Sequence, residues 1–555
     1  MTKKILVFIG IYWYLFPSPA SASGEFYIKQ NVDYKFDALG RSTITFNVSL
    51  TNKTANYYAS KYELELVGED PKNVTGRDSV GPLKIITSPT AADTTRIVAN
   101  FNDVVAGPGK SLSFTLQYQG KPAVHNGQVW EINLPKLSHP ATVDEYTLNL
   151  IVPLSFGQPA YLSPPPASSD GNRYVFTKDQ LSKVGVVAAF GNFQTFSFRL
   201  KYKINTPSQI ALPADTAYQR IFFDSITPLP NSVTADADGN WLAGFNPGEI
   251  VVTGQANLLL EPLSSFTDSP PEKYLFPTAY WPADNPQIKE LAKSLKTPRK
   301  IYDYVVENLE YDYASAASLT ATRKGALTAL SSGLGVCTEF TDLFIALARA
   351  AGIPAREVNG YGYTTDLRLR TPLHSWPQYW DATRQVWVSV DPTWSRTTGG
   401  IDYFSKLDFN HLSFVTHGLS DSLPDFSATD IQVSYGSYHE YPATPLITKW
   451  QSPLFILPFI PSTIRLRITN PNSQAVYSNP VTLPPYGSKV LTVRYTLIRP
   501  FDFSPKSVTL INMTYNIPTT LFLPWQIGFA ILISLTLIAG SLYLQKRFRP
   551  GSIRR

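Results

Sequence analysis

The stretch GLGVCTEFTDLFIALARAAGIP, residues 333–354, contains the only cysteine of this 555-residue chain. Its apolar residues recur three and four positions apart, which predicts an amphipathic helix. Gly352 tolerates the left-handed conformation that often follows a helix, and Pro354 prevents continuation. We therefore expect a helix over about 337–351, with Cys337 in its first turn.

Cys337 has no second cysteine in the chain with which to form an internal disulfide. A free cysteine of this kind is an inert small hydrophobe, an intermolecular link or a reactive thiol. At a helix start, unpaired backbone N–H groups and the positive end of the helix dipole favour the thiolate form. A thiolate is the nucleophile that acyl chemistry requires. Position alone leaves the inert and the reactive interpretation open.

A second stretch, LHSWPQYWDATRQVWVSVDPTW at residues 373–394, has two aromatic and β-branched runs around the polar segment DATR. This pattern predicts a β-hairpin with a four-residue loop. We expect Trp380 to pair with Gln385. In that register His374 stands opposite Asp391 on one face, where a carboxylate can orient an imidazole base. A slip of one residue would separate the two side chains, so this expectation depends on register.

Together the two stretches resemble the transglutaminase-like superfamily. The resemblance covers about 280–400 and rests on GVC at 335–337, RAAGIPAR at 349–356, HSW at 374–376 and DPT at 391–393, in that order. It implies a papain-like α+β core in which Cys337 is the nucleophile, His374 the base and Asp391 the orienting carboxylate. The superfamily includes protein cross-linkers, thiol proteases, amidases that remove glycans, and members without activity. The resemblance is therefore more specific for the fold than for the reaction.

One departure from the family concerns the oxyanion donor. Animal transglutaminases place a tryptophan some tens of residues before the cysteine, and no tryptophan lies between Trp281 and Trp376 here. The backbone N–H of Cys337 offers one donor. Tyr311 and Tyr313 are candidates for the second, although core or rim tyrosines explain both residues as well. The departure favours hydrolysis over cross-linking.

The two ends of the chain predict its location. Residues 1–22 combine a basic start, a twelve-residue apolar run and an Ala-x-Ala pattern, as in a secretory signal peptide. Residues 524–544 carry no charge over 21 positions, enough to cross a bilayer. The basic segment 545–555 then predicts a cytoplasmic tail. We expect a single-pass protein of the cell membrane with its N-terminal ectodomain outside.

The predicted fold class is multidomain α+β, with the transglutaminase-like core flanked by β-sandwich domains and followed by a C-terminal transmembrane helix. Alternating apolar and polar residues between Gly-, Pro- and Asn-rich turns predict short strands in the flanking regions. The expected divisions are an N-terminal β-sandwich at 23–205, a smaller β unit and linker at 206–265, the catalytic domain at 272–425 and an immunoglobulin-like β domain at 440–518.

Charge and composition limit the class of partner. The net charge is +6, but the basic residues at the two ends supply all of it, so the ectodomain is close to neutral. This balance argues against a nucleic-acid partner. The five histidines other than His374 are scattered without metal-site spacing, and we expect His411 and His417 at the surface. No metal or cofactor is expected, and the oligomeric state stays open.

The leading functional hypothesis is a membrane-anchored thiol enzyme that hydrolyses or transfers acyl groups of extracellular protein or peptide amides through a thioester on Cys337. The alternative is a non-catalytic surface adhesin or scaffold whose β domains bind a partner and whose core is vestigial. An intact triad favours the enzyme, because a binding module does not need all three residues together.

Overall fold

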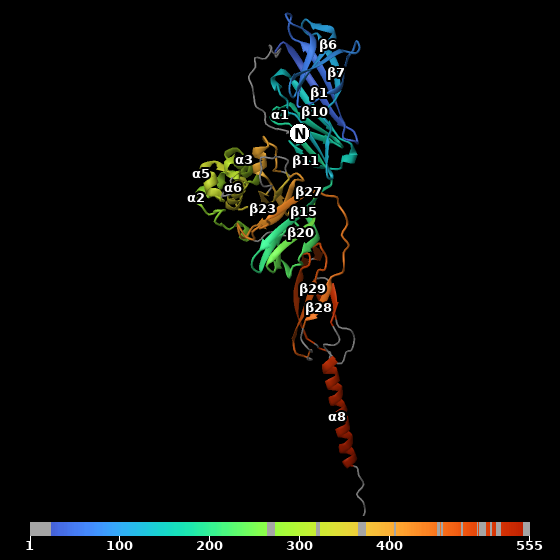
Figure 1. The fold of residues 1–555 in the computed structure, drawn as a ribbon, viewed down its shortest axis with the longest axis vertical. Coiled ribbons are helices and arrows are strands. Elements are labelled where there is room, and N and C mark those ends of the chain that lie inside the picture. The colour runs from blue at the N-terminus through green and yellow to red at the C-terminus, as the bar shows by residue number, and fades with distance from the viewer. Residues whose placement is uncertain are drawn as a thin grey trace, which may run out of the picture.

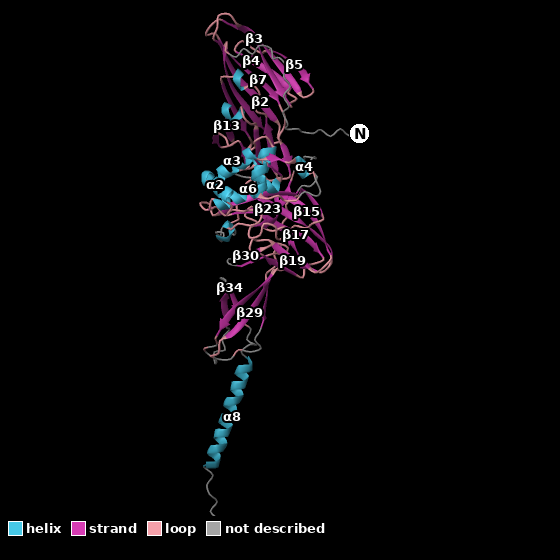
Figure 2. Ribbon diagram, turned by 90° about the vertical axis from the view of Figure 1, so that its left-hand side faces the viewer, coloured by secondary structure: helices cyan, strands magenta, loops and turns pink. Residues whose placement is uncertain are grey.

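A computed structural model describes residues 24–263, 272–317, 322–363, 373–404, 407–451, 456, 459–478, 481–496, 498, 507–510, 513–517 and 523–547. The predicted signal peptide, most of the linker before the core and the tail beyond 547 lie outside the described residues. The molecule is elongated, with β-sheets at the N-terminal end, the α+β core at its middle and a single long helix at the C-terminal end (Figure 1). The helices α2, α3 and α6 gather beside the central sheets (Figure 2).

The N-terminal part is a layered β structure. A seven-stranded sheet packs through one apolar core against a four-stranded and a three-stranded sheet. Alternation of buried and partly exposed residues produces this packing. Every second residue of β2 is buried, as predicted for a strand with one face toward the core and the other toward solvent. The seven-stranded sheet has the order β12 (Ser168–Asp170), β13 (Arg173–Thr177), β10 (Glu145–Ile151), β1 (Phe26–Phe36), β2 (Ser42–Asn52), β7 (Ser111–Gln119) and β4 (Lys72–Asp78). The four-stranded sheet contains β11 (Pro159–Ser163), β14 (Val186–Phe190), β9 (Val129–Leu134) and β8 (Val124–Asn126), and the three-stranded sheet contains β3 (Tyr58–Val67), β6 (Thr94–Ala106) and β5 (Lys84–Ala91).

A second β unit supports the core from one side. Strand β15 pairs along its whole length with β20, and β27, which follows the core in sequence, completes the other edge of β15. The core is therefore inserted between two segments of one sheet, which ties its entry and exit points together. The sheet has the order β17 (Gln219–Thr227), β20 (Gly248–Leu259), β15 (Phe193–Ile204) and β27 (Asp430–Tyr435); a smaller sheet has β16 (Ser208–Leu212), β19 (Trp241–Phe245) and β18 (Ser232–Ala235).

The α+β core packs helices against a four-stranded antiparallel sheet. Its central helix α6 contacts β24 and β23 as well as the neighbouring helices. The sheet has the order β25 (Val386–Ser389), β24 (Leu373–Asp381), β23 (Ala355–Gly362) and β26 (His411–His417). The helices are α2 (Pro286–Leu295), α3 (Pro298–Asn308), α4 (Tyr313–Ala316), α5 (Ala326–Ser332), α6 (Cys337–Ala350) and α7 (Pro392–Thr397); α1 (Lys178–Leu181) belongs to the N-terminal part, and the short strands β21 (Glu310–Tyr311) and β22 (Leu334–Gly335) pair in parallel.

The predicted cysteine helix is confirmed almost residue for residue. Helix α6 begins at Cys337 and ends at Ala350, and Gly352 has the left-handed φ of 81° that the sequence predicted. Its helical-period residues Phe340 and Phe344 are fully buried. Because the opposite side of α6 is buried as well, this helix is the centre of the core and holds Cys337 on a rigid element.

The hairpin forms, but the expected register is wrong by two residues. Trp380 pairs with Trp387 and Gln378 with Ser389, so β25 ends before Asp391. The loop lies one residue later than predicted because Asp381 stays in the strand and accepts hydrogen bonds from the N–H groups of Thr383 and Arg384. A shift of two keeps every side chain on its original face. His374 and Asp391 therefore still face the same side.

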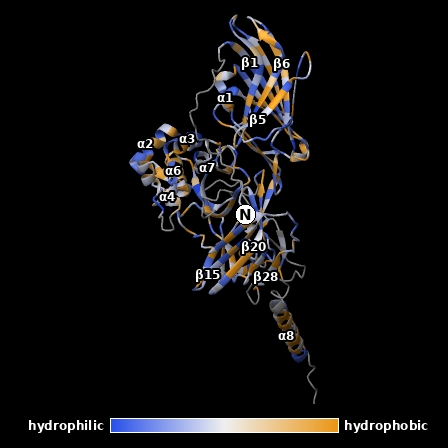
Figure 3. Ribbon diagram, turned by 45° about the horizontal axis from the view of Figure 1, so that its top comes forward, coloured by the Kyte–Doolittle hydropathy of each residue, from blue (hydrophilic) through white to orange (hydrophobic). Residues whose placement is uncertain are grey.

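The C-terminal part is a smaller β region followed by helix α8. The helix segment 525–547 is apolar and long enough to cross a membrane, and none of it is buried against the rest of the chain. In Figure 3 much of its ribbon has the colour of hydrophobic residues. The strands are β28 (Ile447–Gln451), β29 (Ser462–Thr469), β30 (Val476–Ser478), β31 (Val481–Leu483), β32 (Ser488–Tyr495), β33 (Ser507–Leu510) and β34 (Met513–Asn516), and α8 is Leu523–Arg547. The immunoglobulin-like assignment and the domain boundaries stay predictions.

Candidate active site

Cys337 occupies the first residue of α6, and the turn that leads into it is tightly fixed. The carboxylate of Glu339 accepts hydrogen bonds from the backbone N–H of Val336 at 3.0 Å and of Lys324 at 2.8 Å. Glu339 is only 2% exposed, so these bonds satisfy a buried charge. The thiol itself is half-buried. A nucleophile on a rigid helix start with partial access to solvent is the arrangement expected of a reactive cysteine.

His374 lies on β24 next to the thiol. Its Nε2 atom is 2.7 Å from Oδ2 of Asp391, and Cys337 lies near enough to influence the pKa of the ring. Burial lowers the pKa of His374, but the charge and hydrogen bond of Asp391, together with Cys337, outweigh it and raise this pKa to about 10. The ring is therefore protonated at neutral pH and pairs electrostatically with the groups on either side of it.

Asp391 is fully buried and caps helix α7. Its Oδ1 accepts the backbone N–H of Trp394 at 2.9 Å, the bond of a helix N-cap, while Oδ2 faces the histidine. Burial raises the pKa of Asp391, but the charge and hydrogen bond of His374, helped by His411, hold it well below its usual range. The carboxylate is thus ionised and oriented from both oxygens.

The structure places His374 in contact with Asp391, as the sequence predicted; the catalytic roles of Cys337, His374 and Asp391 stay predictions. The sequence of residues 285–392 matches the family described as the transglutaminase-like superfamily. Residues 285–392 belong to the transglutaminase-like superfamily.

Among solved structures, a candidate cysteine protease from Cytophaga hutchinsonii is 18% identical and has a TM-score of 0.32; the match covers 46% of this chain and 93% of that one. The periplasmic domain of TgpA from Pseudomonas aeruginosa is also 18% identical, with a TM-score of 0.24 and coverage of 37% and 91%. A candidate protease from Parabacteroides distasonis is 14% identical, with a TM-score of 0.19 and coverage of 86% and 94%. With TM-scores below 0.5, these likenesses carry no argument about activity. No curated protein matches the chain.

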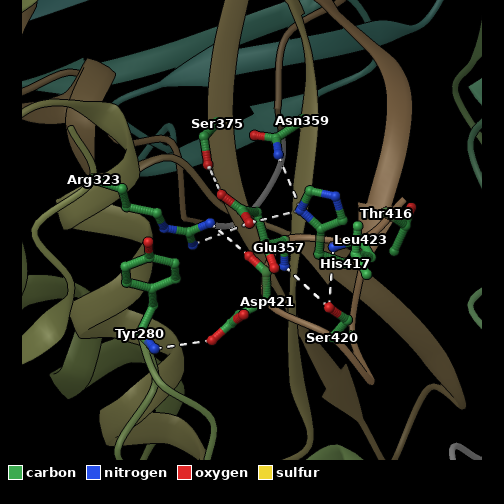
Figure 4. A network of polar contacts seen from close by, with 12 residues as sticks. Tyr280, Arg323, Glu357, Asn359, Ser375, Thr416, His417, Ser420, Asp421 and Leu423 are labelled. Carbon is green, nitrogen blue, oxygen red and sulfur yellow. Dashed lines mark hydrogen bonds and ion pairs between the residues drawn. The ribbon is translucent and has the colours of Figure 1, made fainter. Parts of the chain in front are cut away.

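A buried ion network fixes the transglutaminase-like helix on its sheet (Figure 4). Arg323 pairs with Asp342 of α6 and, at 3.1 Å, with Glu357 of β23. Glu357 in turn accepts from the Ser375 hydroxyl at 2.7 Å and lies 3.0 Å from Nδ1 of His417. Because removal of one partner would leave buried charge uncompensated, this network holds α6, β23, β24 and β26 in one arrangement.

The expectation that His411 and His417 lie at the surface is wrong. Both are buried, because their strand β26 runs inside the core against β23. Leu412, Phe414 and Val415 between them were the signal of a buried strand. His411 is the functional candidate that sequence reasoning missed: its Nε2 lies 3.0 Å from the same Oδ2 of Asp391 that faces His374.

The structure also places His411 beside the predicted pair of His374 and Asp391. One ligand atom each from His374, Asp391 and His411 lie within 4.8 Å of one another, a spacing that metal sites also use. The two histidine contacts to Asp391, at 2.7 and 3.0 Å, have hydrogen-bond geometry and satisfy these atoms directly. We assign no metal to the cluster.

The tryptophan and the two tyrosines considered as oxyanion donors differ in their contacts and exposure. Trp281 is fully buried and its indole N–H donates to Asp342 at 2.7 Å, so it is committed to the ion network. Tyr311 pairs through its backbone with Gly335, two residues before Cys337, and the charge of Cys337 contributes to its raised pKa after burial. Tyr313 is 51% exposed and packs edge-on against Tyr311. Of these residues, Tyr311 is half-buried and is affected electrostatically by Cys337.

Proposed function

We propose that this protein is a membrane-anchored, extracytoplasmic thiol enzyme that cleaves protein or peptide amides through an acyl-enzyme on Cys337. The observation that carries the proposal is the contact of 2.7 Å between Nε2 of His374 and Asp391, with Cys337 at the start of α6 near enough to raise the pKa of the same ring. A nucleophile, a base and an orienting carboxylate in hydrogen-bonded sequence are the parts that amide cleavage needs.

In the proposed reaction the Cys337 sulfur attacks the amide carbon, and the carbonyl oxygen gains negative charge. The backbone N–H of Cys337 donates to this oxygen, and the Tyr311 hydroxyl is the proposed second donor. His374 gives its proton to the leaving amine as the C–N bond breaks and the thioester forms. Water then attacks the thioester carbon and loses a proton to His374; the C–S bond breaks, the acid product leaves, and the Cys337 thiolate and protonated His374 are regenerated.

Hydrolysis is proposed over transfer to an amine because Trp281, the last tryptophan before the cysteine, is held by Asp342. An animal cross-linker presents a tryptophan N–H to the substrate oxygen. Here the N–H of Trp281 donates to Asp342 instead. The proposed anchor is α8, whose exposed apolar surface suits a bilayer and whose last turn carries Lys546 and Arg547.

The test uses full-length protein in detergent micelles. Cleavage of a fluorescent casein substrate is measured beside incorporation of a fluorescent primary amine into the same substrate. We expect cleavage that disappears in Cys337→Ala, with the variant melting at the temperature of the unmodified protein. If amine incorporation is faster than cleavage, the proposed reaction is acyl transfer to an amine instead of hydrolysis. Equal cleavage by Cys337→Ala would refute the thiol mechanism.

A further inference from the structure

His411 stands behind the triad with both ring nitrogens against carboxylates. Its Nε2 lies 3.0 Å from Oδ2 of Asp391 and its Nδ1 lies 2.9 Å from Oδ1 of Asp408. The side chain is 2% exposed and is enclosed by the rings of Trp376 and Trp394, at 5.1 and 4.3 Å between centroids. This is a buried ring with a fixed orientation and no water-facing nitrogen.

The contacts define the protonation of His411. A neutral imidazole has one N–H, so it cannot donate to two carboxylates at once; only the imidazolium donates from both nitrogens. Burial lowers the pKa of His411, but the hydrogen bonds to Asp391 and Asp408 raise it above its ordinary value. Its two carboxylate contacts thus suit the imidazolium form, and its ring centroid lies 5.7 Å from that of His374.

We propose that His411 is a positioning residue of the triad, which fixes the Asp391 carboxylate and, as a cation, keeps His374 acidic enough to release its proton to the leaving amine. The proposal rests on the function proposed above. It assigns a role to a residue outside the cysteine, histidine and aspartate that the sequence marks as catalytic candidates.

The positioning part follows from the hydrogen bonds of Asp391. Its Oδ1 is held by the N–H of Trp394 and its Oδ2 by His374 and His411. When the ring of His374 moves or loses its proton during turnover, the bond from His411 keeps Oδ2 in place. Without His411, Oδ2 of Asp391 would be oriented by His374 alone, whose protonation changes during the proposed turnover.

The electrostatic part follows from the sign of the charges. Asp391 stabilises the protonated form of His374 and so opposes proton release, while a second cation nearby favours release. Removal of the His411 charge should therefore raise the pKa of His374. The other titratable groups that face this pair are Cys337 of α6, Tyr302 of α3, Tyr311 of β21, and Tyr403 and Asp408 before β26.

The single cysteine allows a test that needs no substrate. Alkylation of Cys337 is followed by intact mass in full-length protein, with iodoacetate and with iodoacetamide, between pH 7 and 11. The anionic reagent is favoured while His374 is positively charged, so the ratio of the two rates falls as His374 deprotonates. In the unmodified protein we expect this fall near pH 10. In His411→Gln the pKa of His374 should rise by about one to two units, as expected for loss of a charge at this distance, so the ratio should still be high at pH 10–11, where that of the unmodified protein has fallen.

His417→Gln is the matched control, because His417 is a buried histidine of the same strand that contacts Glu357 instead of Asp391. Its ratio should fall at the pH of the unmodified protein. Thermal melting checks that each variant is folded, and His411→Asn replaces His411→Gln if the latter is not. If the pH at which the ratio falls is unchanged or lower in the folded His411 variant, the role proposed for His411 is overturned, while the function proposed above is not. Absence of any fall in the unmodified protein would overturn the acid role of His374, and this inference with it.

Discussion

Oδ2 of Asp391 is shared by two histidines, at 2.7 Å from His374 and 3.0 Å from His411. The carboxylate reaches this position as the N-cap of α7 and not as a strand partner of His374. A helix cap fixes the backbone and one oxygen, which leaves the other oxygen for the histidines. The orientation of the proposed base therefore depends on the start of a short helix.

Asp391→Asn separates the charge of this residue from its cap. Asparagine also caps helices, so α7 should persist, while loss of the negative charge should lower turnover of the casein substrate by about 10²–10⁴-fold. The fall in the iodoacetate to iodoacetamide ratio should move to lower pH, because Asp391 raises the pKa of His374. Asp381→Asn is the control: Asp381 closes the hairpin turn of the same strand pair, and its replacement should leave both measurements unchanged. Equal effects of the two variants would contradict the charge argument.

Stability should depend on pH through His374. Its pKa is about 10 in the folded protein and 6.5 ordinarily, so its stabilisation is complete below about pH 6.5 and is lost as the pH rises toward 10. His374→Gln should therefore show a smaller decrease in melting temperature between pH 7 and 10 than the unmodified protein. His139→Gln, which changes an exposed histidine, should follow the unmodified protein. Parallel melting profiles for all three proteins would argue against the linkage.

Arg323 should contribute strongly to the stability of the core. Arg323→Leu leaves Asp342 and Glu357 buried without their shared cation, which should cost about 3–5 kcal/mol in the free energy of unfolding of the core. Arg96→Leu removes the exposed pair with Glu65 and should cost at most about 1 kcal/mol. Denaturant unfolding followed by tryptophan fluorescence measures both. A small effect at Arg323 would mean that the core relaxes around the two acids.

Tyr311→Phe tests the proposed oxyanion donor. Loss of one donor should lower kcat for the casein substrate by about 10²-fold or more and leave KM close to its original value, because the bond forms mainly in the transition state. Tyr313→Phe, a change at the adjacent and more exposed ring, should alter kcat little. An unchanged kcat in Tyr311→Phe would mean that another group donates the second hydrogen bond to the oxyanion.

The sequence determined the local features of the core because they depend on neighbouring residues. The start of α6 at Cys337, the left-handed Gly352 and the apolar face of α6 are short-range features, so each was predicted from the local sequence. The hairpin register was not, because Asp381 decided where the turn began by hydrogen bonds to its own loop. The error of two residues preserved the face, so the proximity of His374 and Asp391 followed in spite of it.

The contact of His411 with Asp391 and the pairing of Arg323 with Glu357 were decided by the tertiary structure alone. These contacts join residues from strands and loops far apart in sequence, and nothing in a single strand shows which carboxylate its histidine will meet. Periodicity identifies the buried face of an element but not the element that covers it. Local sequence thus determined the helix that begins at Cys337, while long-range packing decided the electrostatic surroundings of His374 and Asp391.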